Sequence, residues 1–139
     1  MHDSAVRGNV SELAVAAACW RAGYIVSAPM GDSVKYDLVI DDRERLYRVQ
    51  VKTGRKSGKG VLKFGCASHH NDRLQKGSVR QTKYAAHDFD YIGVYCWENG
   101  NVYLVPREDM DITQRHIFLH FSRVPGELLA DKYKLRYTI

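Results

Sequence analysis

The feature that most constrains the fold is the alternation of side chains along Leu46–Thr53. In an extended chain, Val49 and Val51 fall on one face, whereas Gln50 and Lys52 fall together on the other. This period of two is typical of a β-strand with one buried face. The stretch therefore predicts a sheet whose apolar face is covered by another layer.

That layer is predicted to be a helix containing the apolar run Leu13–Trp20. Asn9 and Glu12 stand three positions apart just before the run, as in a capping box, so we expect the helix to begin at Asn9. Because the helix is apolar almost all round, we expect it to lie buried against the sheet. The run is too short to cross a membrane, which would require about 18 apolar residues.

The other predicted elements include both strands and helices. An ordinary soluble composition and 139 residues fit one domain, spanning residues 1–139. The order of helix, three strands, helix and strand predicts an α/β domain with a central mixed sheet. The expected segments are strands at 24–26, 36–40 and 61–67, a flexible basic loop at 54–60, an irregular polar stretch at 68–78, a short helix at 79–87, a hairpin at 90–105, a strand at 116–121 and a helical turn within 126–133.

The formal net charge of +5 hides a strong segregation of charge. Residues 43–83 contain twelve basic and two acidic side chains, whereas the rest of the chain contains nine basic and fourteen acidic ones. A basic block inside one domain is the electrostatic footprint of a protein that meets phosphates. The alternative is a solvated basic surface that only keeps the chain soluble, and charge alone does not decide between the two.

One constellation fits the chemistry of phosphodiester hydrolysis. Asp37 interrupts an otherwise apolar or aromatic strand, and Gln50 and Lys52 share a face of the next one. A divalent cation prefers oxygen ligands, which the Asp37 carboxylate, the Gln50 amide and the Val51 carbonyl would supply. Lys52 would stabilise the charge that develops on the phosphate. Glu12 would hold a second cation or orient the attacking water.

Each of these residues also has a purely structural interpretation. Glu12 would be only the partner of Asn9 in the capping box, and Asp37 would end a strand and cap a turn. Gln50 and Lys52 would be solvent-facing residues of an edge strand. Their joint occurrence beside a basic segment favours the catalytic interpretation.

At these positions the chain resembles the PD-(D/E)XK nuclease superfamily, and within it the group that includes an intron-encoded homing endonuclease. The helix glutamate is also a feature of archaeal Holliday junction resolvases, a related branch. The resemblance implies a restriction-endonuclease-like core, an α/β fold with a central mixed sheet flanked by helices. It is carried by the segments Gly8–Glu12, Gly23-Tyr24, Tyr36–Leu38, Val49–Thr53, Phe89–Tyr91 and Tyr103–Pro106.

The resemblance also implies roles for individual residues. Asp37 would be the principal metal ligand, Lys52 the catalytic lysine and Glu12 the accessory acid. Gln50 stands where most of the superfamily has Asp or Glu, so the site loses a negative charge and would hold its cation less tightly. This departure leaves open whether one or two cations take part.

The reaction implied is hydrolysis of double-stranded DNA of the homing or restriction type, with Mg²⁺ as cofactor and Mn²⁺ as a substitute. Resolution of branched DNA, and a catalytically weak DNA-binding relative, are the alternatives. Cutting both strands would require a homodimer or a dimer of dimers. No secretory signal is recognised, so a cytoplasmic location is expected. The expected DNA contacts are Arg55, Lys56, Lys59, Arg73, Lys76, Arg80 and Lys83.

Overall fold

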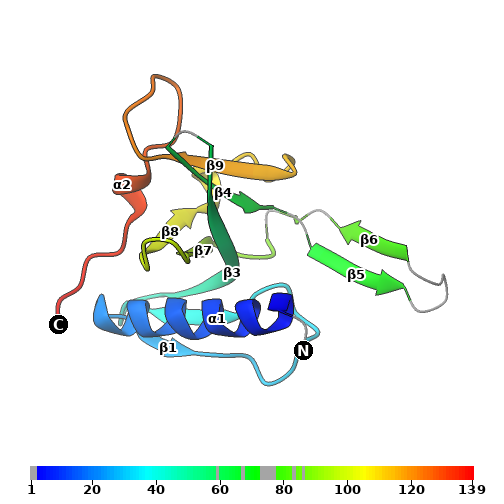
Figure 1. The fold of residues 1–139 in the computed structure, drawn as a ribbon. Coiled ribbons are helices and arrows are strands. Elements are labelled where there is room, and N and C mark those ends of the chain that lie inside the picture. The colour runs from blue at the N-terminus through cyan, green and yellow to red at the C-terminus, as the bar shows by residue number, and fades with distance from the viewer. Residues whose placement is uncertain (1–2, 59, 67, 73–77, 83, 86) are drawn as a thin grey trace.

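The structure is a computed structural model that describes residues 3–58, 60–66, 68–72, 78–82, 84–85 and 87–139, with the backbone alone for 68–72 and 78–82. Figure 1 shows the helix α1 lying along a mixed sheet. No helix within the described ranges is long and apolar enough to span a membrane. The elements are α1 Asp3–Arg21, β1 Ile25–Ser27, β2 Leu38–Asp41, β3 Leu46–Ser57, β4 Val61–Gly65, β5 Ser68–Asp72, β6 Ser78–Thr82, β7 Tyr91–Cys96, β8 Val102–Pro106, the 3-10 turn Arg107–Asp109, β9 His116–His120 and α2 Ala130–Tyr133.

The large sheet has the strand order β1-β2-β3-β4-β9, with β7 and β8 joined to it through β3. β3 and β7 run parallel, whereas the other strand pairs in this sheet are antiparallel. The predicted mixed sheet and the β7–β8 hairpin are therefore confirmed. Two apolar clusters fill the fold, one between α1 and the sheet and one beneath β4, β9 and α2.

The length of β3 differs from the prediction. Residues 54–57 continue the strand, and 55–57 pair with Val61–Lys63 of β4, so the basic loop predicted at 54–60 is wrong over 54–57. Close packing explains why the chain has a glycine at position 54. A Cβ at position 54 would lie 2.6 Å from Cγ1 of Val94 and 2.8 Å from Cδ1 of Leu62.

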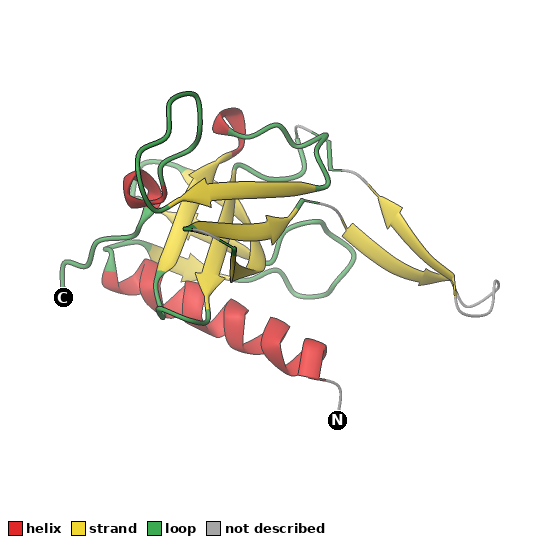
Figure 2. Cartoon of the chain, turned by 45° about the horizontal axis from the view of Figure 1, so that its top comes forward, coloured by secondary structure: helices red, strands yellow, loops and turns green. Residues whose placement is uncertain are grey.

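The segment after β4 also differs from the prediction. Residues 68–72 and 78–82 form the antiparallel strands β5 and β6 instead of an irregular stretch followed by a helix. In Figures 1 and 2 this hairpin extends away from the rest of the chain. Local three- and four-residue spacings predicted a helix at 79–87, but cross-strand pairing overrides them over 78–82.

α1 begins earlier than predicted, at Asp3, where an acidic residue in the first turn suits the helix dipole. Asn9 therefore lies inside the helix, and the predicted capping box with Glu12 is wrong. The helix does pack on the sheet, through Val15, Ala18 and Cys19. Its outer face exposes Leu13, so the helix is covered on one side only.

The contact between α1 and β7 gives a stability prediction. A Cβ at Gly93 would lie 2.7 Å from Cγ1 of Val15 and 3.2 Å from Cγ1 of Val49. Gly93→Ala is therefore expected to lower the free energy of unfolding by about 1–3 kcal/mol, because the helix and strand must separate. Urea denaturation measures the change. Gly65→Ala is the matched control in β4, where an added Cβ meets nothing within 4 Å; equal effects of the two substitutions would contradict this packing argument.

Candidate active site

Asp37 stands at a fork in the sheet. β2 pairs with residues 46–49 of β3 and β4 pairs with residues 55–57, so the edge between them is open to a side chain. The Asp37 amide donates to the Val49 carbonyl at 2.9 Å, and Oδ2 of Asp37 accepts from the Val51 amide at 2.8 Å. Asp37 thus lies directly before β2, not inside a strand as predicted. Its carboxylate takes the place of a strand at this edge.

The Asp37 carboxylate is half-buried, and opposing effects act on its pKa. Burial raises its pKa above the ordinary value, while the hydrogen bond from Val51 and the charge of Lys52 act in the opposite direction. Burial disfavours a lone negative charge, so this carboxylate is held in a place where a cation would be favourable.

Gln50 and Lys52 lie on the face that the alternation predicts. Val49 and Val51 are buried on the α1 side of β3, and the intervening side chains point the other way. Nε2 of Gln50 donates to the Val51 carbonyl at 3.3 Å. The Gln50 amide, the Val51 carbonyl and the Asp37 carboxylate therefore share one strand edge.

Lys52 faces this site from a partly desolvated position. Burial lowers the pKa of its ammonium group, whereas nearby Cys66 and Asp37 act to raise it. Nζ of Lys52 lies 5.1 Å from the centre of the Tyr84 ring, within the range of a cation–π contact.

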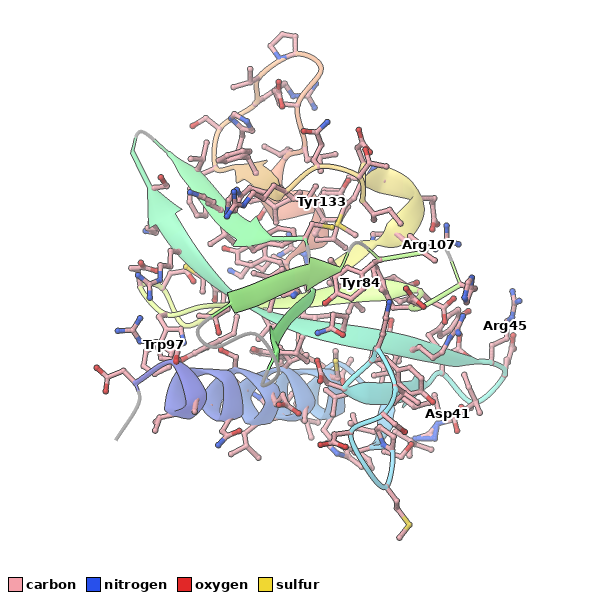
Figure 3. The ribbon with its side chains drawn as sticks, turned by 90° about the vertical axis from the view of Figure 1, so that its right-hand side faces the viewer. Asp41, Arg45, Tyr84, Trp97, Arg107 and Tyr133 are labelled. Atoms are coloured by element: carbon pink, nitrogen blue, oxygen red, sulfur yellow. The ribbon has the colours of Figure 1, made fainter. Side chains whose placement is uncertain are left out.

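Tyr84 is a site residue that the sequence analysis missed. The buried ring of Tyr84 packs edge-on against Phe89, with their centres 5.1 Å apart. Burial raises the pKa of the Tyr84 phenol well above its ordinary value, and the charge of Asp37 adds to that effect. Tyr84 therefore stays neutral and forms a wall beside Lys52. Figure 3 marks the position of Tyr84 against the sheet. No local motif marks it, because it lies 32 positions after Lys52.

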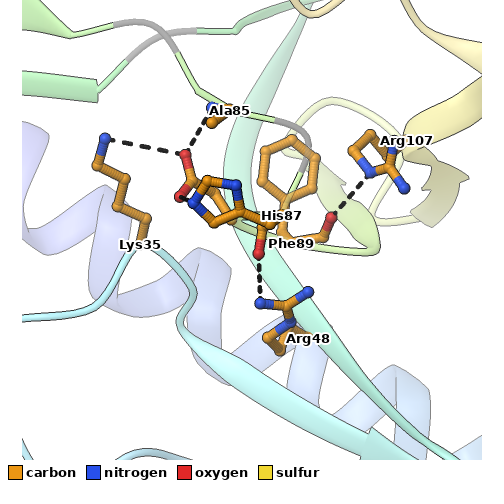
Figure 4. A network of polar contacts seen from close by, with 7 residues as sticks. Lys35, Arg48, Ala85, His87, Phe89 and Arg107 are labelled. Atoms are coloured by element: carbon orange, nitrogen blue, oxygen red, sulfur yellow. Dashed lines mark hydrogen bonds and ion pairs between the residues drawn. The ribbon is translucent and has the colours of Figure 1, made fainter.

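Polar contacts tie the segment around Tyr84 to the sheet and to the loop before β2 (Figure 4). The Asp88 carboxylate accepts from the Ala85 amide at 2.6 Å and lies 3.8 Å from Nζ of Lys35. Arg48 donates to the His87 carbonyl from β3. These bonds fix the chain between Tyr84 and β7, and with it the wall of the site.

Two adjoining clefts surround Asp37. One of about 330 Å³ is lined by Asp37, Gln50 and Tyr84, together with residues 32–35. The other, of about 240 Å³, is lined by Asp37 and Glu12, beneath residues 28–36. The loop before β2 therefore borders both clefts.

Glu12 lies in the middle of α1 and faces Asp37 across the smaller cleft. Burial raises the pKa of Glu12, and the negative charge of Asp37 raises it further. Because Asn9 and Glu12 form no capping box, the structural interpretation of Glu12 is not supported.

Within the described part of the chain, no group of three or more His, Cys, Asp or Glu side chains is close enough to hold a metal ion. A cation here would depend on neutral oxygens as well as carboxylates.

The predicted DNA contacts are only partly described. Arg55 and Lys56 are exposed on the far half of β3. The Lys56 ammonium lies 5.3 Å from the centre of the Phe121 ring. Arg80 belongs to β6, where the structure describes the backbone alone. Lys59, Arg73, Lys76 and Lys83 lie outside the described residues.

The donor set consists of oxygens beside a lysine, at the forked edge of a helix-backed mixed sheet. Oxygen donors suit a hard divalent cation such as Mg²⁺ or Mn²⁺, so these residues fit the cofactor that the sequence analysis expects. This fold and edge define the class of nucleases with a restriction-endonuclease-like core.

Comparison with known proteins agrees with that class. A family model described as PD-(D/E)XK endonuclease matches residues 2–125, and the chain belongs to this family. A solved structure of a bacterial homing endonuclease, I-Ssp6803I, is similar with a TM-score of 0.74 and 25% sequence identity, over 96% of this chain and 89% of that one. No curated protein matches. The predicted family resemblance and fold are therefore confirmed.

Proposed function

We propose that this chain is a single-domain, metal-dependent endonuclease that hydrolyses phosphodiester bonds of double-stranded DNA, with Mg²⁺ as its cofactor and Mn²⁺ as a substitute. The observation that carries the proposal is the meeting of Asp37, Gln50 and the Val51 carbonyl at one strand edge, with Lys52 beside them. A similar homing endonuclease structure favours duplex DNA as the substrate.

Each residue has a distinct role in this proposal. The Asp37 carboxylate, the Gln50 amide oxygen and the Val51 carbonyl would hold the cation, which when bound neutralises charge on the phosphate. Lys52, kept near the site by the Tyr84 ring, stabilises the negative charge that develops on the phosphoryl oxygens. Glu12, with its raised pKa, accepts a proton from the attacking water more readily than an ordinary glutamate.

The exposed basic residues would contact the DNA backbone. Lys56 follows Lys52 on the same face of β3, so a DNA strand held at the site would extend over it, whereas Arg55 lies on the opposite face. Backbone contacts of this kind make binding steeply dependent on salt. Because one chain offers one site, cutting both strands calls for a homodimer or a dimer of dimers, in which two copies act on opposite strands.

The test of this function is cleavage of supercoiled plasmid in Mg²⁺, in Mn²⁺ and in EDTA. We expect nicking or linearisation with either cation and none in EDTA. No cutting of any DNA with either cation would leave a DNA-binding protein without nuclease activity. A helix glutamate like Glu12 is also a feature of archaeal Holliday junction resolvases. Cleavage of a four-way junction is therefore compared with cleavage of a linear duplex library. Preferential cutting of the junction would favour that second function.

The neutral side chain at position 50 leads to a prediction about cation affinity. Gln50→Glu restores a carboxylate, so Mn²⁺ is expected to bind about tenfold more tightly, since ligand charge tunes affinity at oxygen sites. Gln50→Leu keeps a similar volume without an oxygen donor and is expected to weaken binding. Calorimetric titration of the protein without DNA measures both. Loss of both binding and cleavage in Gln50→Glu would count against Gln50 as a cation ligand, and unchanged binding in both variants would place Gln50 outside the site.

A further inference from the structure

A third cleft lies away from the candidate active site, between the start of α1 and the turn after β7. Its volume is about 360 Å³. Thr53 lines it, and because neighbouring residues of a strand point to opposite faces, this cleft and Lys52 are on opposite sides of β3. We name it the Trp97 cleft; it is lined by Arg7, Thr53, Arg55, Trp97 and Glu98.

The Trp97 ring is held in a fixed orientation. Its Nε1 donates to the hydroxyl of Ser11 at 3.4 Å, and that buried hydroxyl is 2.6 Å from the Thr53 hydroxyl. The Tyr95 ring supports it edge-on, with the centres 5.8 Å apart. Trp97 nevertheless remains 42% exposed. The polar edge of the indole is thus turned inward, while part of the ring faces solvent. Figure 3 shows Trp97 beside the first turns of α1.

Two guanidinium groups border the exposed indole. In the described part of the chain, the side chains of Arg7 and Arg55 make no hydrogen bond or ion pair with a protein group. The Glu98 carboxylate is engaged elsewhere, by the Lys56 amide at 3.3 Å and by the Cys96 thiol at 3.5 Å. Two arginines against one carboxylate leave the cleft positive. Unpaired guanidinium groups are suited to phosphate, which they bind in a planar, bidentate manner.

We propose that the Trp97 cleft binds an unpaired nucleotide of DNA, with its base stacked on Trp97 and its phosphate between Arg7 and Arg55. A base inside a duplex has both faces covered by its neighbours, so only an unpaired base can stack on a protein ring. Arg55 is three residues from Lys52, about 10 Å along the strand. The inference rests on the proposed function, since it takes DNA as the ligand, and it adds a site for single-stranded DNA on the side of β3 opposite Lys52.

The test uses Trp97 as its own reporter, with cleavage suppressed by EDTA. The chain has two tryptophans, so Trp20→Phe, a change on the exposed face of α1, leaves Trp97 as the sole source of indole fluorescence. The protein is titrated with a mixed-sequence single strand, with its blunt duplex and with inorganic phosphate. We expect the single strand to quench Trp97 and the other two to leave its fluorescence unchanged.

Affinity measurements then test the individual residues. Trp97→Ala is expected to weaken binding of the single strand about tenfold, the size of the loss when one stacking ring is removed. Since that change also removes a contact with Ser11, Arg7→Gln on the surface of α1 is made separately and is expected to weaken binding several-fold. Arg123→Gln, which removes an equal charge from a different cleft, is the matched control and should leave single-strand affinity unchanged.

Three results would overturn the proposal. Equal quenching by the duplex would mean that the cleft takes an intact backbone, and quenching by phosphate alone would mean that it takes only an anion. Equal losses in Arg7→Gln and Arg123→Gln would reduce the effect to general charge. Failure here is distinguishable from failure of the nuclease proposal, because plasmid cleavage in Mg²⁺ does not report on Trp97 fluorescence and the quenching assay does not need cleavage.

Discussion

Asp37→Asn is expected to reduce DNA cleavage by about 10³-fold while leaving the protein folded, because removal of a charge aimed at the reacting centre commonly costs a factor of this size. The asparagine keeps an oxygen that accepts from the Val51 amide, so the 2.8 Å hydrogen bond at the fork survives. Only the negative charge is lost. Initial rates of plasmid nicking at saturating Mg²⁺ measure the effect.

The same substitution is expected to leave the free energy of unfolding unchanged or to raise it. Burial raises the pKa of Asp37, which means that the fold pays a cost for its charge. Chemical denaturation at neutral pH measures this part. Asp131→Asn is the matched control, because Asp131 is an exposed carboxylate that pairs with Arg136 at 3.3 Å. If Asp37→Asn cleaves within a few-fold of the unmodified protein, Asp37 is a structural residue.

Lys52→Met is expected to lower cleavage by about 10²-fold to 10³-fold, because it removes the positive charge beside the phosphate. Burial lowers the pKa of Lys52, so the fold tolerates its charge at a cost. The methionine keeps the apolar stem and suits the face of Tyr84, since sulfur packs well on aromatic rings. Stability should therefore be maintained while the rate falls.

Lys132→Met provides the matched control for that change. Nζ of Lys132 lies 5.5 Å from the centre of the Tyr133 ring, a similar contact on the surface and away from the clefts around Asp37. We expect it to leave the cleavage rate unchanged. Equal rates for Lys52→Met and the unmodified protein, at equal stability, would exclude Lys52 from the reaction.

The parts of the site that the sequence predicted are those governed by strand periodicity. Side chains two positions apart share a face of any strand, so Gln50 and Lys52 were correctly placed together. Asp37 was recognisable because a carboxylate between apolar residues is costly without a purpose. Its position just before β2 was not, because the end of a strand depends on pairing with its neighbour.

The parts that were missed depend on contacts between distant residues. Tyr84 contacts Lys52 from a part of the chain where His87 accepts a hydrogen bond from Arg48 and Asp88 pairs with Lys35. The sequence around Gly54 does not show whether glycine is needed there for a turn or because the Val94 side chain packs closely against it. The spacing of Asn9 and Glu12 predicted a helix start at Asn9, but α1 already begins at Asp3.

The central claim is that Asp37, Gln50 and Val51 hold a divalent cation beside Lys52. The most direct measurement is anomalous X-ray diffraction from crystals of the protein grown with Mn²⁺. We predict a manganese peak within about 2.5 Å of both the Asp37 carboxylate and the Val51 carbonyl oxygen, the distance range of oxygen ligands to divalent cations. Manganese bound only at other residues, in a protein that cleaves DNA with Mn²⁺, would contradict the claim.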